Sequence, residues 1–176
     1  MKRVLFTICA VLVGVSAFAG NPLKVVNTKE NLKDFMKQKA AAVLVIDWSK
    51  TKFDNRKAAS AEFGKDWSFI KSDCESKFIE AFNDKSKGIQ LQKGAKGAKY
   101  KFVLTVTNVD DHVNVMGYGP RTEAKFWGKL KIVEAPKGKV IAEINIEEAE
   151  DGVDYVRKEA LGKTFALLAK RLAKIK

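Results

Sequence analysis

The sequence predicts an α+β fold: a single-domain, two-layer sandwich in which a mixed, mostly antiparallel sheet carries two main helices packed on one face. Three observations predict it. The continuous apolar run AAVLVIDW, at residues 41–48, is typical of a central strand covered on both faces. Two stretches of alternating apolar and polar residues, 122–135 and 139–150, are joined by a tight turn. Residues 67–84 and 154–176 carry apolar side chains at helical spacing.

The first nineteen residues predict a secretory signal peptide. Lys2 and Arg3 precede an apolar run at residues 4–15, and Ala17 and Ala19 supply the small side chains that signal peptidase recognises. Cleavage is expected after Ala19. A membrane anchor, the alternative, would need a longer apolar run, and a lipid-attached protein would need a cysteine at the cleavage point. We therefore expect a chain that is secreted across the inner membrane into the periplasm, with no transmembrane segment after processing.

Residues 20–40 are expected to form a leader and a short helix ahead of a single α/β domain at residues 41–176. Asn27 can cap this helix, because Glu30 follows three residues later as in a capping box. Within residues 41–176 the sequence shows no convincing repeat and no domain boundary.

Residues 49–67 have no clear periodicity and combine polar with aromatic side chains. Long connections of this kind in compact domains are often functional. The helix predicted at 67–84 has an apolar stripe formed by Ile70, Cys74, Phe78, Ala81 and Phe82. Cys74 is the cysteine that remains after signal removal, which excludes an internal disulfide. Its place in the stripe favours a small packed thiol over a reactive one.

A short strand at 89–92 leads into the glycine-rich, basic stretch KGAKGAK at 93–99. A solvated hairpin loop is the expectation for this stretch, and anion binding by its backbone amides is the alternative. Residues 100–109 alternate clearly and predict a strand.

The two strands at 122–135 and 139–150 predict an antiparallel hairpin whose exposed face carries lysines on one strand and glutamates on the other. Opposite charges on paired strands contribute about 0.2–1 kcal/mol per pair to the stability of the sheet. In the terminal helix, the GKT tripeptide at 162–164 resembles a phosphate-binding loop, but Arg157 stands where that motif requires glycine. Nucleotide binding is therefore excluded.

The stretch NVDDHVNV, at residues 108–115, contains His112, the single histidine of the chain. On a regular strand Asp110 and His112 share one face while Asp111 points to the other. A metal site needs three or four convergent ligands, and the chain offers no second histidine and no available cysteine. The favoured interpretation is a strand end followed by a mobile crossover at 112–123, with no metal and no cofactor. The alternative is a metal-dependent or hydrolytic enzyme that uses Asp110 and His112.

The composition is strongly basic, with 33 Lys and Arg against 21 Asp and Glu. The predicted signal holds two basic and no acidic residues, so the exported chain would keep a net charge of +10. Such a surface attracts anionic partners such as lipid headgroups, lipopolysaccharide or acidic proteins. Export from the cytoplasm argues against nucleic acid as the partner of this basic surface. The alternative is that the charge serves solubility alone.

The candidate partner-binding residues are aromatic and basic. They combine rings around residues 49–67 with nearby cations and with the lysines of KGAKGAK, because aromatic and arginine anchors dominate binding interfaces. The alternative is that the rings close the end of the sheet. The candidates are Trp48, Phe53, Arg56, Lys57, Phe63, Trp67, Lys93, Lys96 and Lys99, with Lys50 and Lys52 alongside.

The layout resembles bacterial cell-envelope domains of the TolB amino-terminal type. The pieces that carry the resemblance are VLVID, AKYKFVLTVTNVD, the strand pair joined at APKGKVIAE and the terminal amphipathic helix, over residues 41–176. The group includes periplasmic domains of curli-secretion lipoproteins and of lipoprotein activators of peptidoglycan synthases, together with uncharacterised exported proteins. The resemblance implies action by protein contact, as adaptor, assembly factor or activator. This chain lacks the lipid-attachment cysteine, and no partner-binding motif is matched, so no functional residue is carried over.

We therefore expect an exported, non-catalytic domain that binds another envelope component, with electrostatic attraction that weakens in salt. The alternatives are the enzyme based on Asp110 and His112, and binding to an anionic lipid or lipopolysaccharide surface.

Overall fold

The computed structural model describes residues 21–28, 31–115, 120–135 and 137–175. The predicted signal peptide and its cleavage after Ala19 lie outside the described residues. So do Gly117 and Gly119 of the turn-prone stretch.

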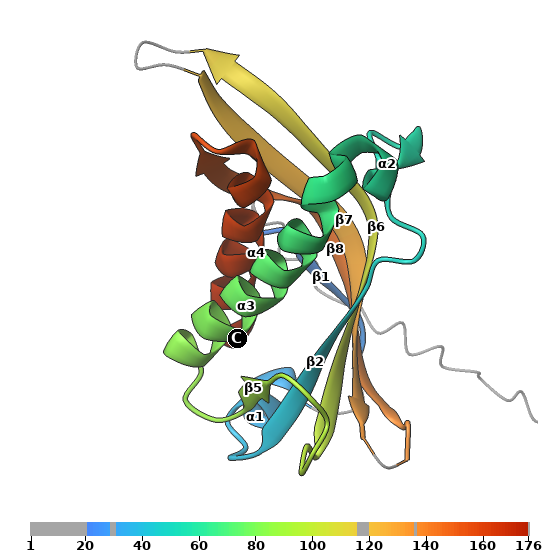
Figure 1. Ribbon diagram of the computed structural model, residues 1–176. Helices are drawn as coiled ribbons and strands as arrows, with labels where there is room; N and C mark the ends of the chain where they lie inside the picture. The colour runs from blue at the N-terminus through green and yellow to red at the C-terminus, as the bar shows by residue number, and fades with distance from the viewer. Residues whose placement is uncertain (1–20, 29–30, 116–119, 136, 176) are drawn as a thin grey trace, which may run out of the picture.

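One mixed sheet forms the frame of the molecule, with strand order β1-β8-β7-β6-β2-β5 and a small β3–β4 hairpin attached to β6. The pairs of β8 with β1, β8 with β7, and β7 with β6 are antiparallel, whereas β2 is parallel to both β6 and β5. Two long helices, α3 (Trp67–Lys85) and α4 (Arg157–Ala173), pack side by side on one face of this sheet (Figure 1). The predicted α+β sandwich is confirmed.

The strands β6 (Tyr100–Val115), β7 (Pro120–Glu134) and β8 (Val140–Asp154) make up most of the sheet. Their core-facing side chains are buried, among them Phe102, Phe126 and Ile144. The expected charge pairing on the opposite face is present, because Lys129 and Lys131 both contact Glu143, at 2.8 and 3.2 Å.

The prediction that the strand ends within NVDDHVNV and continues as a crossover is wrong. β6 runs to Val115, and its pairing with β7 continues to Pro120. The polar side chains that suggested a strand end find partners on other elements. Asp111 binds Arg157, and His112 pairs across the strands with Glu123.

The amino-terminal part differs in two ways from expectation. Residues 23–28, described above as leader, form β1 (Leu23–Thr28), which extends the sheet next to β8. Asn27 lies in this strand and does not cap the following helix. The cap of α1 (Leu32–Met36) is Asn31, whose side-chain oxygen accepts hydrogen bonds from the Lys33 and Asp34 N–H groups.

The strands β2 (Ala41–Asp47) and β5 (Gln90–Gln92) form the other side of the sheet. KGAKGAK is not a hairpin loop, because it connects β5 to β6, which lie on opposite sides of β2 and run parallel to it. Gly94 and Gly97 adopt positive φ values of 83° and 74°, which lets this short connection turn sharply.

The helices pack through the stripes that the sequence predicts. Ile70, Cys74 and Phe78 of α3 are buried, as are Leu161 and Phe165 of α4. Within the described residues, no helix has the length and apolar character needed to cross a membrane.

The glycine and threonine of the GKT tripeptide contribute to this packing. A Cβ atom at Gly162 would collide with the carboxylate of Asp73 on α3, so glycine leaves room for this side chain between the two helices. The buried Thr164 hydroxyl donates a hydrogen bond of 2.7 Å to the carbonyl oxygen of Ala124 on β7.

Candidate binding surface

Four predicted aromatic residues form a continuous row where β2 gives way to the segment that leads to α3. Trp48 follows β2, Phe53 lies in β3 (Lys52–Phe53), Phe63 ends α2 (Ala59–Phe63), and Trp67 begins α3. We call these residues the aromatic row. The structure therefore brings together rings that are up to 19 positions apart in the sequence.

The geometry of the row is regular. Phe53 meets Phe63 edge-on at 5.6 Å, Phe63 stacks on Trp67 at 5.7 Å, and Trp67 meets Trp48 edge-on at 5.2 Å. Trp48 then stacks on Phe165 of α4 at 5.4 Å, which joins the row to the core. All four rings are half-buried. They close this end of the core and at the same time present part of their surface to solvent.

The segment that carries Phe53 is fixed to β6 by polar contacts. The Thr51 hydroxyl donates to the Val106 carbonyl oxygen at 2.8 Å, and the Asn108 side-chain oxygen accepts from the Asn55 N–H at 2.8 Å. Asp54 and Asn55 turn the chain from β3 to β4 (Lys57–Ala58) with φ values of 48° and 55°. Aspartate and asparagine tolerate this left-handed region better than other residues that carry a side chain.

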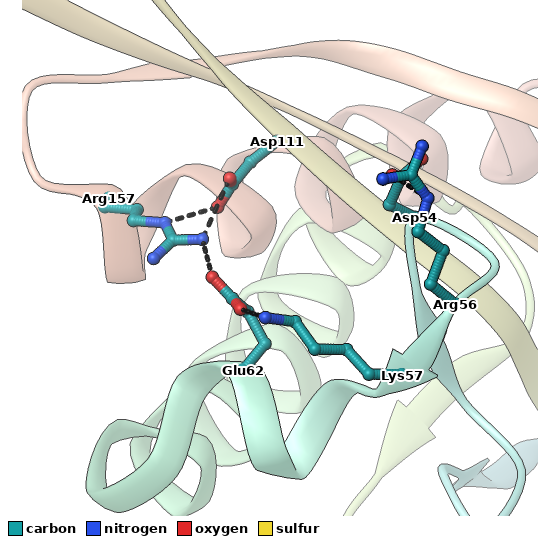
Figure 2. A network of polar contacts seen from close by, with 6 residues as sticks. All are labelled: Asp54, Arg56, Lys57, Glu62, Asp111 and Arg157. Atoms are coloured by element: carbon teal, nitrogen blue, oxygen red, sulfur yellow. Dashed lines mark hydrogen bonds and ion pairs between the residues drawn. The ribbon is translucent and has the colours of Figure 1, made fainter.

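Figure 2 shows an ion-pair cluster centred on Arg157. This cluster lies against the outer end of the aromatic row, at Phe53 and Phe63. Its guanidinium donates to both carboxylate oxygens of Asp111, at 2.7 and 3.1 Å, and to Glu62 at 2.6 Å. Glu62 also pairs with Lys57. We call Arg157, Asp111, Glu62 and Lys57 the Arg157 clasp. It joins α4, β6, α2 and β4.

The clasp also contacts the aromatic rings. The Arg157 guanidinium lies 5.1 Å from the centre of the Phe63 ring and 5.7 Å from that of Phe53, and the Lys57 ammonium lies 5.9 Å from Phe53. Cations over ring faces attract the aromatic quadrupole. The clasp therefore fixes the orientation of Phe53 and Phe63.

The charges of the clasp stabilise one another. Hydrogen bonds from Lys57 and then Arg157 hold the pKa of the Glu62 carboxyl below its ordinary value of 4.5. The bond to Asp111, with that to Glu62, raises the pKa of Arg157 above its ordinary value despite its partial burial. At neutral pH Glu62 and Arg157 are therefore both ionised and pair with each other.

The remaining predicted candidates are divided between two places. Arg56 is exposed beside the row and pairs with Asp54 at 3.1 Å. Lys93, Lys96 and Lys99 lie instead around the β5–β6 connection. Lys93 donates to Ser76 on α3 at 2.9 Å, and Lys99 lies over the Tyr100 ring. The structure therefore does not bring these three lysines into the aromatic row.

Asp111 and His112 of NVDDHVNV contact different partners. The His112 Nε2 atom lies 2.8 Å from the Glu123 carboxylate, and both side chains are partly exposed. Asp111 is held in the Arg157 clasp. In the ranges that the structure describes, no group of three or more His, Cys, Asp or Glu side chains is arranged to hold a metal ion. Cys74 is buried, and burial raises the pKa of its thiol well above the ordinary value.

Arg157, Asp111 and Glu62 are the residues of this surface that the sequence did not single out. Arg157 follows Asp111 by 46 positions and Glu62 by 95. In the sequence, Arg157 stands out only as the residue in place of the glycine that a phosphate-binding loop requires. Only the pairing of β6 with β7 and β8 brings it to Asp111, so no short-range signal could have identified the cluster.

Comparison with known proteins gives structural likeness alone. No protein-family model matches the chain, and no curated protein matches it significantly. Among solved structures, the chain is similar to the PelC dodecamer from Paraburkholderia phytofirmans, with 12% identity and a TM-score of 0.41 over 85% of this chain and 94% of that one.

Two further solved structures are similar. Protein XCC0632 from Xanthomonas campestris has 12% identity and a TM-score of 0.37 over 78% of this chain and 84% of that one. A minor lipoprotein from Acinetobacter baumannii has 15% identity and a TM-score of 0.33 over 77% of this chain and 87% of that one. Likeness at this level assigns neither a family nor a function to the chain.

Proposed function

We propose that the chain is an exported, non-catalytic binding module of the bacterial cell envelope, which contacts another envelope component through the aromatic row and the exposed cations beside it. The observation that carries the proposal is the row itself. Four half-buried rings, from β3, α2, α3 and the residue that follows β2, lie in continuous contact, and the Arg157 clasp holds two of them, Phe53 and Phe63. The signal-like amino terminus and the TolB-type layout support the envelope location.

A rigid aromatic surface suits binding for a physical reason. Large rings bury much apolar area on contact, and side chains that are already ordered lose little conformational freedom when a partner docks. The clasp supplies this order, because Arg157 bonds two carboxylates while it lies over Phe63 and Phe53.

The exposed cations next to the row supply attraction. Lys50, Lys52 and Arg56 are exposed in the same segment. With the excess of basic residues over the whole chain, they favour encounter with an anionic partner. Rim charges of this kind act mainly on the association rate and on salt dependence.

Affinity capture from a solubilised envelope fraction tests the proposal. The variant Lys50→Glu/Lys52→Glu reverses charge beside the row, whereas the control Lys137→Glu/Lys139→Glu reverses the same charge in the β7–β8 turn, at the other end of the sheet (Figure 1). At low salt we expect the first variant to capture at least tenfold less of the partner than the wild type does, and the control to capture as much as the wild type. Equal capture by both variants would contradict the proposal.

The enzyme hypothesis makes a different prediction at His112. If His112→Ala abolished a measurable turnover or a stoichiometric bound metal, the binding-module proposal would fail. The contact with Glu123 gives this test a control, because Glu123→Gln keeps the histidine and removes the carboxylate charge.

A second candidate function, binding to anionic lipid or lipopolysaccharide, is favoured by exposed rings near the start of α4. Phe69 and Tyr155 are exposed, and each has a cation over its ring: Lys158 at 4.9 Å and Arg121 at 5.1 Å. Aromatic and basic side chains together suit the headgroup region of a bilayer.

Sedimentation with phosphatidylglycerol vesicles tests this second candidate. It predicts binding at low salt that is lost at high salt and in Phe69→Ser/Tyr155→Ser. Absence of binding at low salt would remove it.

A further inference from the structure

On the edge of β2 that faces β5, only the first half of the strand has a neighbouring strand. Its pairing with β6 continues from Ala42 to Asp47, but its pairing with β5 ends at Val43 (Figure 1). Within the described ranges, no strand lies next to the second half of β2 on that side. We call residues 44–47 the open half of β2.

The backbone direction shows which groups face the open side. The Ala40 carbonyl oxygen accepts a hydrogen bond from the Gln90 N–H of β5, whereas the Ala41 carbonyl oxygen accepts one from the Lys99 N–H on the β6 side. Successive residues of a strand point to opposite neighbours, so even-numbered residues face β5. The N–H and C=O groups of Ile46 therefore point to the uncovered edge.

A groove lies along this edge, between β2 and helix α3. Its volume is about 370 Å³, and it is lined by Ile46 and Trp48 on the strand side and by Ser68, Lys71, Ser72 and Glu75 on the helix side. The four helix residues recur at three- and four-residue spacing and therefore form one face of α3. A strand placed in the groove would have the β2 backbone on one side and this polar helix face on the other.

Apolar side chains on the open half would gain cover from such a strand. Val45 is 40% exposed on the sheet face away from the helices, and Ile46 is half-buried on the helix side. Natural edge strands are usually protected by a bulge, a proline or an inward charge. The opposite edge of the sheet has such a bulge, at the register shift between Val25 and Asn27 of β1. Residues 44–46 are uniformly apolar and carry none of these devices.

The charge of the groove selects among peptides. Glu75 pairs with Lys93 at 3.8 Å, whereas Lys71 has no ion-pair partner among the described residues. Lys71 therefore leaves a positive charge on the groove wall, which an acidic side chain would neutralise.

We propose that the open half of β2 binds an extended peptide segment of a partner protein as an added strand, in line with β5 and beside α3, with apolar residues at alternate positions and an acidic residue near Lys71. An extended backbone is the ligand that satisfies a strand edge, and pockets beside the edge read its alternate side chains. The groove shares Trp48 with the aromatic row. The inference still goes beyond the proposed function, because a peptide bound here need not touch Phe53 or Phe63.

Selection of a random decapeptide library on the full chain tests the inference. Ser72→Trp fills the groove, and Glu80→Trp places the same side chain at an exposed position of α3 outside it. We expect enriched peptides with alternating apolar residues and an acidic residue, which bind Glu80→Trp as they bind the wild type and bind Ser72→Trp at least tenfold more weakly. Enrichment of no sequence, or equal binding to both variants, would overturn the inference.

Amide exchange gives a readout that does not depend on a variant. Saturation with a selected peptide should slow exchange of the Ile46 amide at least tenfold and leave the Val45 amide, which faces β6, unchanged. Unchanged exchange at Ile46 overturns the inference. Protection of Ile46 in a dimer without peptide also overturns it, because a second copy would then be the occupant. Neither result bears on capture through the aromatic row, which Lys50→Glu/Lys52→Glu tests separately.

Discussion

Replacing Arg157 by methionine should destabilise the protein and loosen the aromatic row. Methionine keeps most of the apolar stem of the side chain but removes three hydrogen bonds, two to Asp111 and one to Glu62. Glu62 keeps its contact with Lys57. Asp111, whose side chain is 9% exposed, loses the guanidinium that neutralises it.

The size of the loss follows from burial. Removing one partner of a fully buried ion pair costs about 3–5 kcal/mol, whereas exposed pairs contribute about 0.2–1 kcal/mol. The Arg157 side chain is 45% exposed while Asp111 is buried, so this pair lies between the limits, at about 2 kcal/mol after allowance for solvent screening. Loss of the contacts with the Phe63 and Phe53 rings adds about 0.5–1 kcal/mol. The expected total is about 2.5–3 kcal/mol.

Urea unfolding and thermal melting measure this loss. For a domain of this size the expected fall in Tm is about 5–12 °C. The matched control is Arg56→Met, because the Arg56 side chain is 84% exposed and its one ion pair among the residues that the structure describes is with Asp54. Its effect should stay within about 0.5 kcal/mol. A loss below 0.5 kcal/mol for Arg157→Met, or equal losses for both variants, would refute the role given to the clasp.

Three further predictions concern the helix contact, pH and the thiol. Gly162→Ala should lower the free energy of unfolding by about 1 kcal/mol, since overpacking against Asp73 costs about 1–3 kcal/mol and alanine regains about 1 kcal/mol of helix propensity. In an Asp73→Ala background the same change should stabilise the protein, because the carboxylate that it would meet is gone. Thermal melting of the wild type, both single variants and the double variant checks this. The pKa values of Glu62 and Glu143 are held below 4.5 by lysine and arginine partners, so the unfolded chain binds more protons below that pH. The stability from these pairs is therefore present above about pH 4.5 and lost as pH falls, and Glu62→Gln/Glu143→Gln should show a shallower fall of Tm with acid. Cys74 should stay unreactive towards a thiol reagent until the protein unfolds, because its thiol is buried and its pKa is raised; rapid labelling of the native protein would contradict this.

The elements that sequence predicts correctly are those whose signals are local. The alternation in β7 and β8 identifies the buried faces, and it places Lys129 and Lys131 on the same exposed face as Glu143. In the sheet register Lys131 lies opposite Glu143, and Lys129 reaches the same carboxylate from the neighbouring pair. The stripes of α3 and α4 follow from helical spacing in the same way, since core burial repeats every three or four residues.

The elements that sequence misses depend on distant partners. β1 has one buried residue, Leu23, so alternation cannot reveal it, and only its pairing with β8 defines it as a strand. β6 continues through Asp111 and His112 because Arg157 and Glu123 satisfy those side chains, which local polarity alone could not indicate.

The candidate site was predictable in part for the same reason. The spacing of Trp48, Phe53, Phe63 and Trp67 in one segment suggested that their rings gather, and they do. The Arg157 clasp that orients them joins residues from three distant parts of the chain, so it emerges only once the sheet is assembled.

Site-specific photo-crosslinking in intact cells tests the central proposal most directly. A benzoylphenylalanine in place of Phe53 probes the outer end of the aromatic row, and the same residue in place of Glu80 probes an exposed position on α3 away from it. We predict a discrete crosslinked product from position 53, with a yield that falls in Lys50→Glu/Lys52→Glu, and no such product from position 80. No product from position 53, or the same product from both positions, would contradict the account.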